Sequence, residues 1–124
     1  MITVGIIGPL TPRGEGNHAI EFLENVIEGI HAAGLLIAEG FAPFCPHLDY
    51  QYLLADFHFT DAQLKAVSME WIGRCDVILA LHGWRESKGA IAEYTLACQK
   101  DIPVVEGINE LLKMFPNGAS RLVG

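Results

Sequence analysis

A glutamate lies in a small, apolar stretch of the sequence, SKGAIAEY, residues 87–94. If this stretch is helical, the neighbours of Glu93 on the helix surface are the residues three and four positions away, and all of them are small or apolar. At roughly 100° per residue, Glu93 lies on the order of 130° from the centre of the helix's polar stripe. We therefore expect an inward carboxylate that either pairs with a loop or an arginine, or does chemistry in a pocket that tunes its pKa.

The residues just before Glu93 predict an anion site at the start of the same helix. Ser87 occupies the position of an N-cap, and the backbone N–H groups of Lys88, Gly89 and Ala90 have no acceptor within the helix. Such N–H groups bind anions, and Gly89 permits a close approach. Ordinary helix capping explains the same residues, so both interpretations stay open.

The composition argues against several classes of function. The chain has 124 residues and a net charge of −7, and its eight basic residues form no run, so we expect no nucleic-acid binding. No apolar run reaches the roughly 18 residues that a membrane span needs, and the first residues lack the basic region of a signal peptide. We expect a single domain, residues 1–124, in a soluble cytoplasmic protein without a cofactor.

The metal-ligating residue types are scattered along the chain. Cys45, Cys75 and Cys98 each lie in an apolar segment and form no Cys-x-x-Cys pair, which favours buried thiols in a reducing compartment. His47 and Asp49 are alternate residues of a predicted strand and would point to the same side. A metal at this pair is an alternative, but we expect none.

Apolar strands alternate with helical patterns along the chain. The runs ITVGIIG and CDVILAL are nearly continuous in apolar character, as expected of strands covered on both faces. TDAQ at 60–63 has the form of a capping box, and Pro43 suggests an edge strand. The predicted strands are residues 2–8, 41–47, 75–81 and 102–106, and the predicted helices are residues 17–39, 60–73, 88–100 and a last one from residue 109.

This alternation predicts an α/β fold, a three-layer sandwich around a four- to five-stranded parallel sheet of the Rossmann or flavodoxin-like type. Right-handed crossovers favour the strand order 2-1-3-4. The order reverses between the first and third strands, so the ligand crevice should lie beyond their carboxyl ends. Two predicted loops reach that crevice, residues 9–17 and 82–87.

Four pieces of the chain resemble, in family order, the nucleoside 2-deoxyribosyltransferase-like superfamily. They are GIIGPLTP after the first strand, NV at 25–26, PFCPHL at 43–48, and CDVILALHGWRESKGAIAEYTLACQKDIPVV at 75–105. The last piece is the most specific. The chain looks most like small phage and bacterial members of this superfamily, which also includes the 2'-deoxynucleoside 5'-monophosphate N-glycosidases.

The resemblance implies that Glu93 is a nucleophile. Its carboxylate would attack the anomeric carbon of a (deoxy)ribosyl group as the base leaves, and a glycosyl-enzyme would form. Water then completes a hydrolase reaction, whereas a second base completes a transferase reaction. The carboxylate must be ionised for this attack, which a nearby helix N-terminus favours.

The acid that protonates the leaving base stays open among three residues. Asp76 fits the family pattern, but it begins the third strand, at the opposite end from the crevice, where a structural role is the alternative. His47 and Asp49 end the second predicted strand and could reach the site. Either of them could instead fix a loop.

The resemblance also bears on the substrate. Transferases of this superfamily tend to have Asp six residues before the Glu, whereas the monophosphate hydrolases have Ser there, and this chain has Ser87. Arg13, Arg85 and Lys88 are expected on the mouth loops, where they favour a 5'-phosphorylated substrate. The other substrate-binding candidates are Gly8 and Pro9, through a close backbone approach, Gly89, and Trp84, which either stacks on a base or packs in the core.

The leading interpretation is therefore an N-glycosidase that cleaves the base–sugar bond of a nucleoside or a (deoxy)nucleoside 5'-monophosphate. The alternatives are a non-catalytic nucleotide-binding or sensing domain, a nucleoside deoxyribosyltransferase, and a structural partner without a ligand. We also expect a homo-oligomer, because relatives in this superfamily often complete the pocket with a neighbouring subunit.

Overall fold

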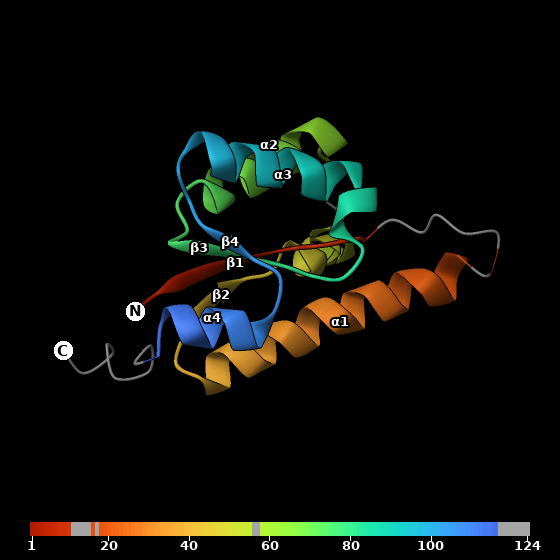
Figure 1. Ribbon diagram of the computed structural model, residues 1–124. Helices are drawn as coiled ribbons and strands as arrows, with labels where there is room; N and C mark the ends of the chain where they lie inside the picture. The colour runs from red at the N-terminus through yellow and green to blue at the C-terminus, as the bar shows by residue number, and fades with distance from the viewer. Residues whose placement is uncertain (11–15, 17, 56–57, 117–124) are drawn as a thin grey trace.

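The computed structural model describes residues 1–10, 16, 18–55 and 58–116, without the side chains of residues 50 and 53. It has a four-stranded parallel sheet in the order β2-β1-β3-β4, as predicted (Figure 1). Because β1 and β3 are the central strands, their burial on both faces explains why both read as continuous apolar runs. The strands are β1 (Thr3–Ile7), β2 (Ala42–Phe44), β3 (Val77–Ala80) and β4 (Val104–Val105).

Helices cover both faces of the sheet, which confirms the α/β layered architecture. Helices α1 (His18–Ala38) and α4 (Ile108–Met114) lie on one face, and α2 (Asp61–Ile72) and α3 (Lys88–Gln99) lie on the other (Figure 1). Each face has its own apolar core. The buried side chains of the first core include Val4, Ile6, Leu36 and Leu111, and those of the second include Ile7, Ile72, Ile78 and Ala97.

Side-chain caps define the starts of the two helices on the second face. The Gln63 N–H donates to Thr60 Oγ1, and the Gln63 side chain accepts from the Thr60 N–H, so the predicted capping box begins α2. Ser87 is the N-cap of α3, because its Oγ accepts from the Ala90 N–H at 3.3 Å. Both caps lie at the positions that the sequence predicts.

Large apolar residues recur in α1 at intervals of three or four positions, a pattern typical of a helix. This pattern does not mark the face of α1 that packs on the sheet. The buried residues of α1 are Val26, Gly29, Ala32, Ala33 and Leu36. In contrast, most of the large side chains of the pattern are exposed: Ile20, Leu23, Ile27, Ile30 and Ile37. The helix therefore has an apolar face on each of two sides, and the one made of smaller residues lies against the core.

Two local predictions differ from the structure. His47 and Asp49 do not end a strand, because β2 stops at Phe44 and both residues lie in a 3₁₀ helix, Pro46–Ala55. Cys98 is exposed, unlike the buried Cys45 and Cys75. The long helix continues through its internal glycines without a break.

No helix within the described ranges is long and apolar enough to cross a membrane.

Candidate functional site

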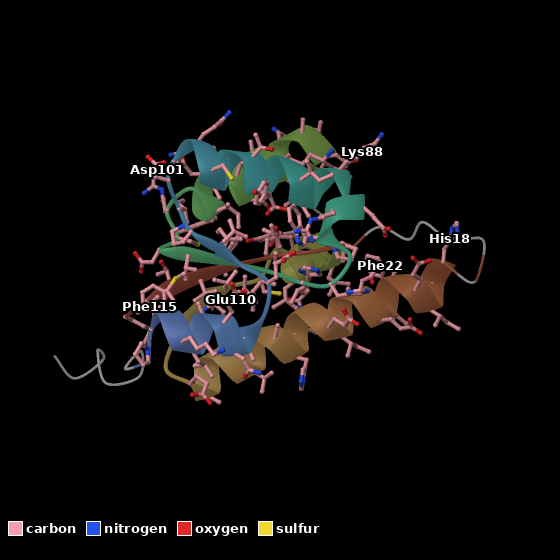
Figure 2. The ribbon with its side chains drawn as sticks, viewed as in Figure 1. His18, Phe22, Lys88, Asp101, Glu110 and Phe115 are labelled. Atoms are coloured by element: carbon pink, nitrogen blue, oxygen red, sulfur yellow. The ribbon has the colours of Figure 1, made fainter. Side chains whose placement is uncertain are left out.

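A cavity of about 440 Å³ lies beyond the carboxyl end of β1, at the point where the strand order reverses. Its walls come from the end of β1, the 3₁₀ helix after β2, helix α2, and the segment that leads into α3. Figure 2 shows Lys88 at the cavity end of α3 and Asp101 beyond the other end of this helix. The lining residues are Ile6, Gly8, Leu10, Pro46, His47, Lys65, Glu86, Ser87, Lys88, Gly89, Ala90 and Glu93.

Glu93 faces inward, as its position on the helix predicts. Its Oε2 atom is buried and has no hydrogen-bond partner in the part of the chain that the structure describes. Burial raises the pKa of this carboxyl to about 7, and the charge of Asp49 adds to the shift. An unpaired buried carboxyl oxygen is costly for a fold, so Glu93 has the features of a group kept for a ligand.

The start of α3 favours the ionised form of Glu93, but burial has a larger opposite effect on its pKa. Glu93 is the sixth residue of the helix, and the effect of the helix dipole is greatest within the first turn. The free-energy cost of burying the charge is larger than the favourable effect of the helix dipole. Near neutral pH, both the protonated and the ionised form of Glu93 are therefore populated.

Asp49 does not line the cavity, but it is the carboxyl whose charge acts on Glu93. Burial raises its pKa above the ordinary value of 3.8, while a hydrogen bond from Ser68 Oγ to Asp49 Oδ2, 3.1 Å long, opposes that shift. Because the charge of Asp49 raises the pKa of Glu93, the two carboxyls lie close enough to interact. Helix α2 supplies Ser68 and thereby holds the side chain that the 3₁₀ helix presents.

His47 lines the cavity and is the single charged or polar residue among the fully buried ones described. Neither ring nitrogen has a hydrogen-bond partner among the described residues. Burial lowers the pKa of the imidazole, against smaller opposite effects from the Pro9 carbonyl and Glu28. The ring lies against α1 at Gly29, where a Cβ atom would come within 2.6 Å of His47 Cγ. The missing side chain at Gly29 makes room for this neutral imidazole.

The opposite side of the cavity suits an anion. Ser87, Lys88 and Gly89 form the start of α3, and the space above Gly89 is open, since a Cβ there would meet no atom within 4 Å. Lys65, on α2, adds a second ammonium group. Lys65 could not be assigned to the site from its sequence position, because only the packing of α2 beside α3 brings it to this cavity. The exposed carboxylate of Glu86 also lines the rim.

Besides Asp49, three further predicted site residues do not line the cavity, and one is outside the described residues. Asp76 accepts hydrogen bonds from the Thr3 N–H and hydroxyl at the amino ends of β1 and β3, which is a structural contact. The Trp84 ring packs on Tyr94, with centroids 4.6 Å apart, and its Nε1 donates to Glu106. Arg85 stacks on Trp84 and pairs with Glu106. Neither residue lines the Glu93 cavity, and Arg13 lies outside the described residues.

Gly8 lines the cavity, and Pro9 reaches the site through the effect of its carbonyl on His47. A Cβ at Gly8 would lie 2.9 Å from Leu81 Cβ, so glycine is needed for the close packing of the two strand ends. The Leu10 carbonyl accepts a hydrogen bond from Asn25 Nδ2 of α1, which fixes the chain after β1. Among the described residues no three His, Cys, Asp or Glu side chains are arranged to hold a metal ion.

Comparison with known families places this site within a recognised group. Residues 6–106 match the family model described as Domain of unknown function (DUF4406). The chain belongs to the DUF4406 family. The matched part contains every residue that lines the Glu93 cavity, whereas α4 lies beyond it. No curated protein and no solved structure matches the chain.

Proposed function

We propose that this DUF4406 protein is an N-glycosidase that cleaves the base–sugar bond of a (deoxy)nucleoside 5'-monophosphate, with Glu93 as the nucleophile. The observation that carries the proposal is the buried, unpaired Oε2 atom of Glu93 in a cavity with an anion-binding side. The sequence resemblance to nucleoside 2-deoxyribosyltransferase-like enzymes supports the same reaction.

In the first step, the Glu93 carboxylate forms a bond to the anomeric carbon of the sugar, and the bond from this carbon to the base nitrogen breaks. The electron pair of the broken bond stays on the base, which takes a proton. Asp49 is the best candidate for the acid, because burial raises its pKa and it interacts with Glu93. Asp76, at the other end of the sheet, does not suit this role.

In the second step, water attacks the anomeric carbon and releases Glu93, while the Asp49 carboxylate accepts the proton of the water. The sum is nucleotide plus water giving free base and sugar 5-phosphate. A second base in place of water gives the transferase reaction. His47 is neutral at neutral pH, so one of its nitrogens donates and the other accepts, which suits contact with a sugar hydroxyl.

The phosphate is proposed to bind at the start of α3. There, backbone N–H groups, the Ser87 hydroxyl and the ammonium groups of Lys65 and Lys88 face the same cavity. Phosphate at this position also orients the sugar, since the anomeric carbon must reach Glu93 one to two turns further along the helix.

The reaction is tested by base release, separated chromatographically, from a panel of nucleosides and their 5'-monophosphates. We expect release by the wild type and none above background by Glu93→Gln, which keeps the shape of the side chain and removes the nucleophile. A matched control is Glu39→Gln, at an exposed residue outside the cavity, which should retain the activity. Equal release by wild type and Glu93→Gln would refute the nucleophile.

The position of the phosphate is tested with Ser87→Asp. Aspartate is as good an N-cap as serine, so α3 should keep its stability, but the added negative charge repels a phosphate. We expect KM for the monophosphates to rise by about tenfold or more, which is roughly 1.4 kcal/mol. Activity on nucleosides should change little. An equal effect on both substrate classes would place the phosphate elsewhere.

One observation favours a second candidate, a nucleotide-binding domain without turnover. With a pKa of about 7, Glu93 is partly protonated near neutral pH and can then donate a hydrogen bond to a base or sugar instead of attacking. This function predicts nucleotide binding with no base release by the wild type, and similar affinity in Glu93→Gln. The same panel, with binding measured by calorimetry, separates the two functions.

A further inference from the structure

Helix α1 carries an exposed apolar stripe on the side away from the core. Six of the thirteen exposed large apolar residues of the described chain lie on this one helix. Ile27 and Ile37 are 62% and 64% exposed, and Ile20 and Leu23 are more than half exposed. In Figure 1, α1 lies at the edge of the molecule, with the sheet and α4 on one side of it. We define the outer stripe as Ile20, Leu23, Ile27, Ile30, Gly34 and Ile37.

The spacing of the outer stripe is that of a helix–helix seam. Its members follow one another at intervals of three, four, three, four and three residues. These alternating intervals are those of a heptad repeat, which keeps a row of side chains facing a second helix. A row that faces water has no need for this regularity. The stripe runs for about 25 Å along the helix, since each residue adds roughly 1.5 Å.

The stripe is complementary to itself when a second copy lies antiparallel. Ile20 then lies opposite Ile37 of the other copy, and Ile27 lies opposite Ile30. Leu23 lies opposite Gly34, the one member without a side chain, where the structure leaves open space above the helix. The Leu23 side chain of each copy thus fills the space above Gly34 of the other copy.

The polar residues beside the stripe fit the same arrangement. Glu24 and His31 lie on one flank of the stripe, and antiparallel packing brings Glu24 of each copy near His31 of the other. In contrast, α1 contains no Lys or Arg, so it lacks the cations that attract an amphipathic helix to an anionic membrane. The net charge of −7 likewise opposes a nucleic acid as the partner.

We propose that the outer stripe of α1 is the interface of a two-fold symmetric homodimer, in which the α1 helices of two copies pack antiparallel. An interface of this kind is isologous, because both copies use the same surface. Each contact therefore occurs twice, related by the two-fold axis. The buried face of each α1 stays on its own sheet, so the dimer forms without rearrangement of the fold.

The dimer is tested by sedimentation equilibrium of the full chain over a range of concentrations. We expect a dimer for the wild type, and Ile27→Glu should raise its dissociation constant by about tenfold or more, because two carboxylates would be buried at the centre of the seam. Val67→Glu is the matched control. Val67 is an apolar residue of α2 that is 47% exposed, and the change there should leave the dimer intact. A wild type that is monomeric at all concentrations would overturn the proposal.

The orientation of the helices is tested with cysteine pairs in a Cys98→Ala background, which removes the exposed native thiol. The double variant Leu23→Cys, Gly34→Cys should form disulfide-linked dimers under mild oxidation, whereas Leu23→Cys alone should not. In the antiparallel dimer the two copies of residue 23 are about 16 Å apart along the axis. Rapid cross-linking of the single variant would show a parallel arrangement and overturn this interface.

Discussion

Glu93 and Asp49 are two partly buried carboxyls, and the charge of Asp49 affects the protonation of Glu93. Burial raises the pKa of both, and the charge of Asp49 makes ionisation of Glu93 still harder. Ser68 opposes the effect of burial on the pKa of Asp49, because its hydroxyl donates a hydrogen bond to Asp49 and stabilises the charged form. A single proton held by the two carboxyls therefore resides mainly on Glu93 in the free protein, so the proposed attack requires that substrate binding move this proton to Asp49.

The raised pKa of Glu93 makes the stability of the fold depend on pH. Below pH 4.5 the carboxyl is protonated in both the folded and the unfolded chain and costs nothing. As the pH rises, the unfolded chain loses its proton first, so the free energy of unfolding falls until about pH 7. The full loss is on the order of 3 kcal/mol. Urea unfolding from pH 4.5 to 8.5 should show this decline in the wild type and a flatter profile in Glu93→Gln.

The control for that measurement is Glu39→Gln, the same chemical change at an exposed residue after α1. This variant should follow the wild-type profile. Parallel curves for the wild type and Glu93→Gln would mean that Glu93 is not the group whose ionisation weakens the fold.

The variant Asp49→Asn separates the effect of the Asp49 charge on the pKa of Glu93 from the effect of burial. Without the charge of Asp49, the pKa of Glu93 should fall from about 7 towards its ordinary value, although burial keeps it above 4.5. The titration of the Glu93 side-chain carboxyl by carbon NMR measures this shift directly. Base release should slow at the same time, because Asn cannot supply the proton. Asp101→Asn, beyond the far end of α3, is the matched control and should not change the titration of Glu93.

At the scale of elements, α1 uses its two glycines differently. At Gly29 a Cβ atom would lie 2.6 Å from the His47 ring, whereas at Gly34 it would meet nothing within 4 Å. Alanine stabilises an open helix position by about 0.5–1 kcal/mol over glycine, so Gly34→Ala should stabilise the fold. Gly29→Ala should destabilise it by about 1–3 kcal/mol, because His47 must move. Urea unfolding in an Ile27→Glu background, which removes self-association, gives both values.

A gain in stability from Gly29→Ala would show that His47 is not confined by α1. A loss from Gly34→Ala would show that the outer side of α1 is covered within a single chain.

The elements that the sequence predicts well are those with a local physical signal. The two central strands are buried on both faces and read as apolar runs, and Thr60 and Ser87 cap helices through side chains only three residues from their partners. Glu93 could be assigned to the inner side of α3 because its apolar neighbours surround it at helical spacing. These properties need no knowledge of distant contacts.

The features that escaped prediction depend on how elements pack. In α1 the small residues, not the large ones, face the sheet, and periodicity alone cannot tell an outer apolar face from an inner one. Lys65 reaches the cavity only because α2 packs beside α3. Trp84 and Arg85 follow β3 as expected, but Glu106, from the end of β4, binds both of them outside the cavity.

For the whole molecule, the site draws on every layer of the sandwich. The sheet supplies Ile6 and Gly8, the second face supplies Lys65 and Glu93, and α1 positions His47 through Gly29. A ligand in the cavity therefore binds the folded chain and not the unfolded one. Ligand binding must then raise the melting temperature of the whole fold.

A nucleoside 5'-monophosphate should stabilise the inactive Glu93→Gln variant by about 2.7 kcal/mol at a concentration of 100 times its Kd. This variant keeps the anion side of the cavity and does not consume the ligand. Adding Lys65→Gln should reduce the rise in melting temperature, because one of the two ammonium groups at the phosphate is lost. Lys113→Gln, on α4 and outside the cavity, should not. If the parent nucleoside gave the same rise as its monophosphate, and Lys65→Gln left both unchanged, the start of α3 would not be a phosphate site.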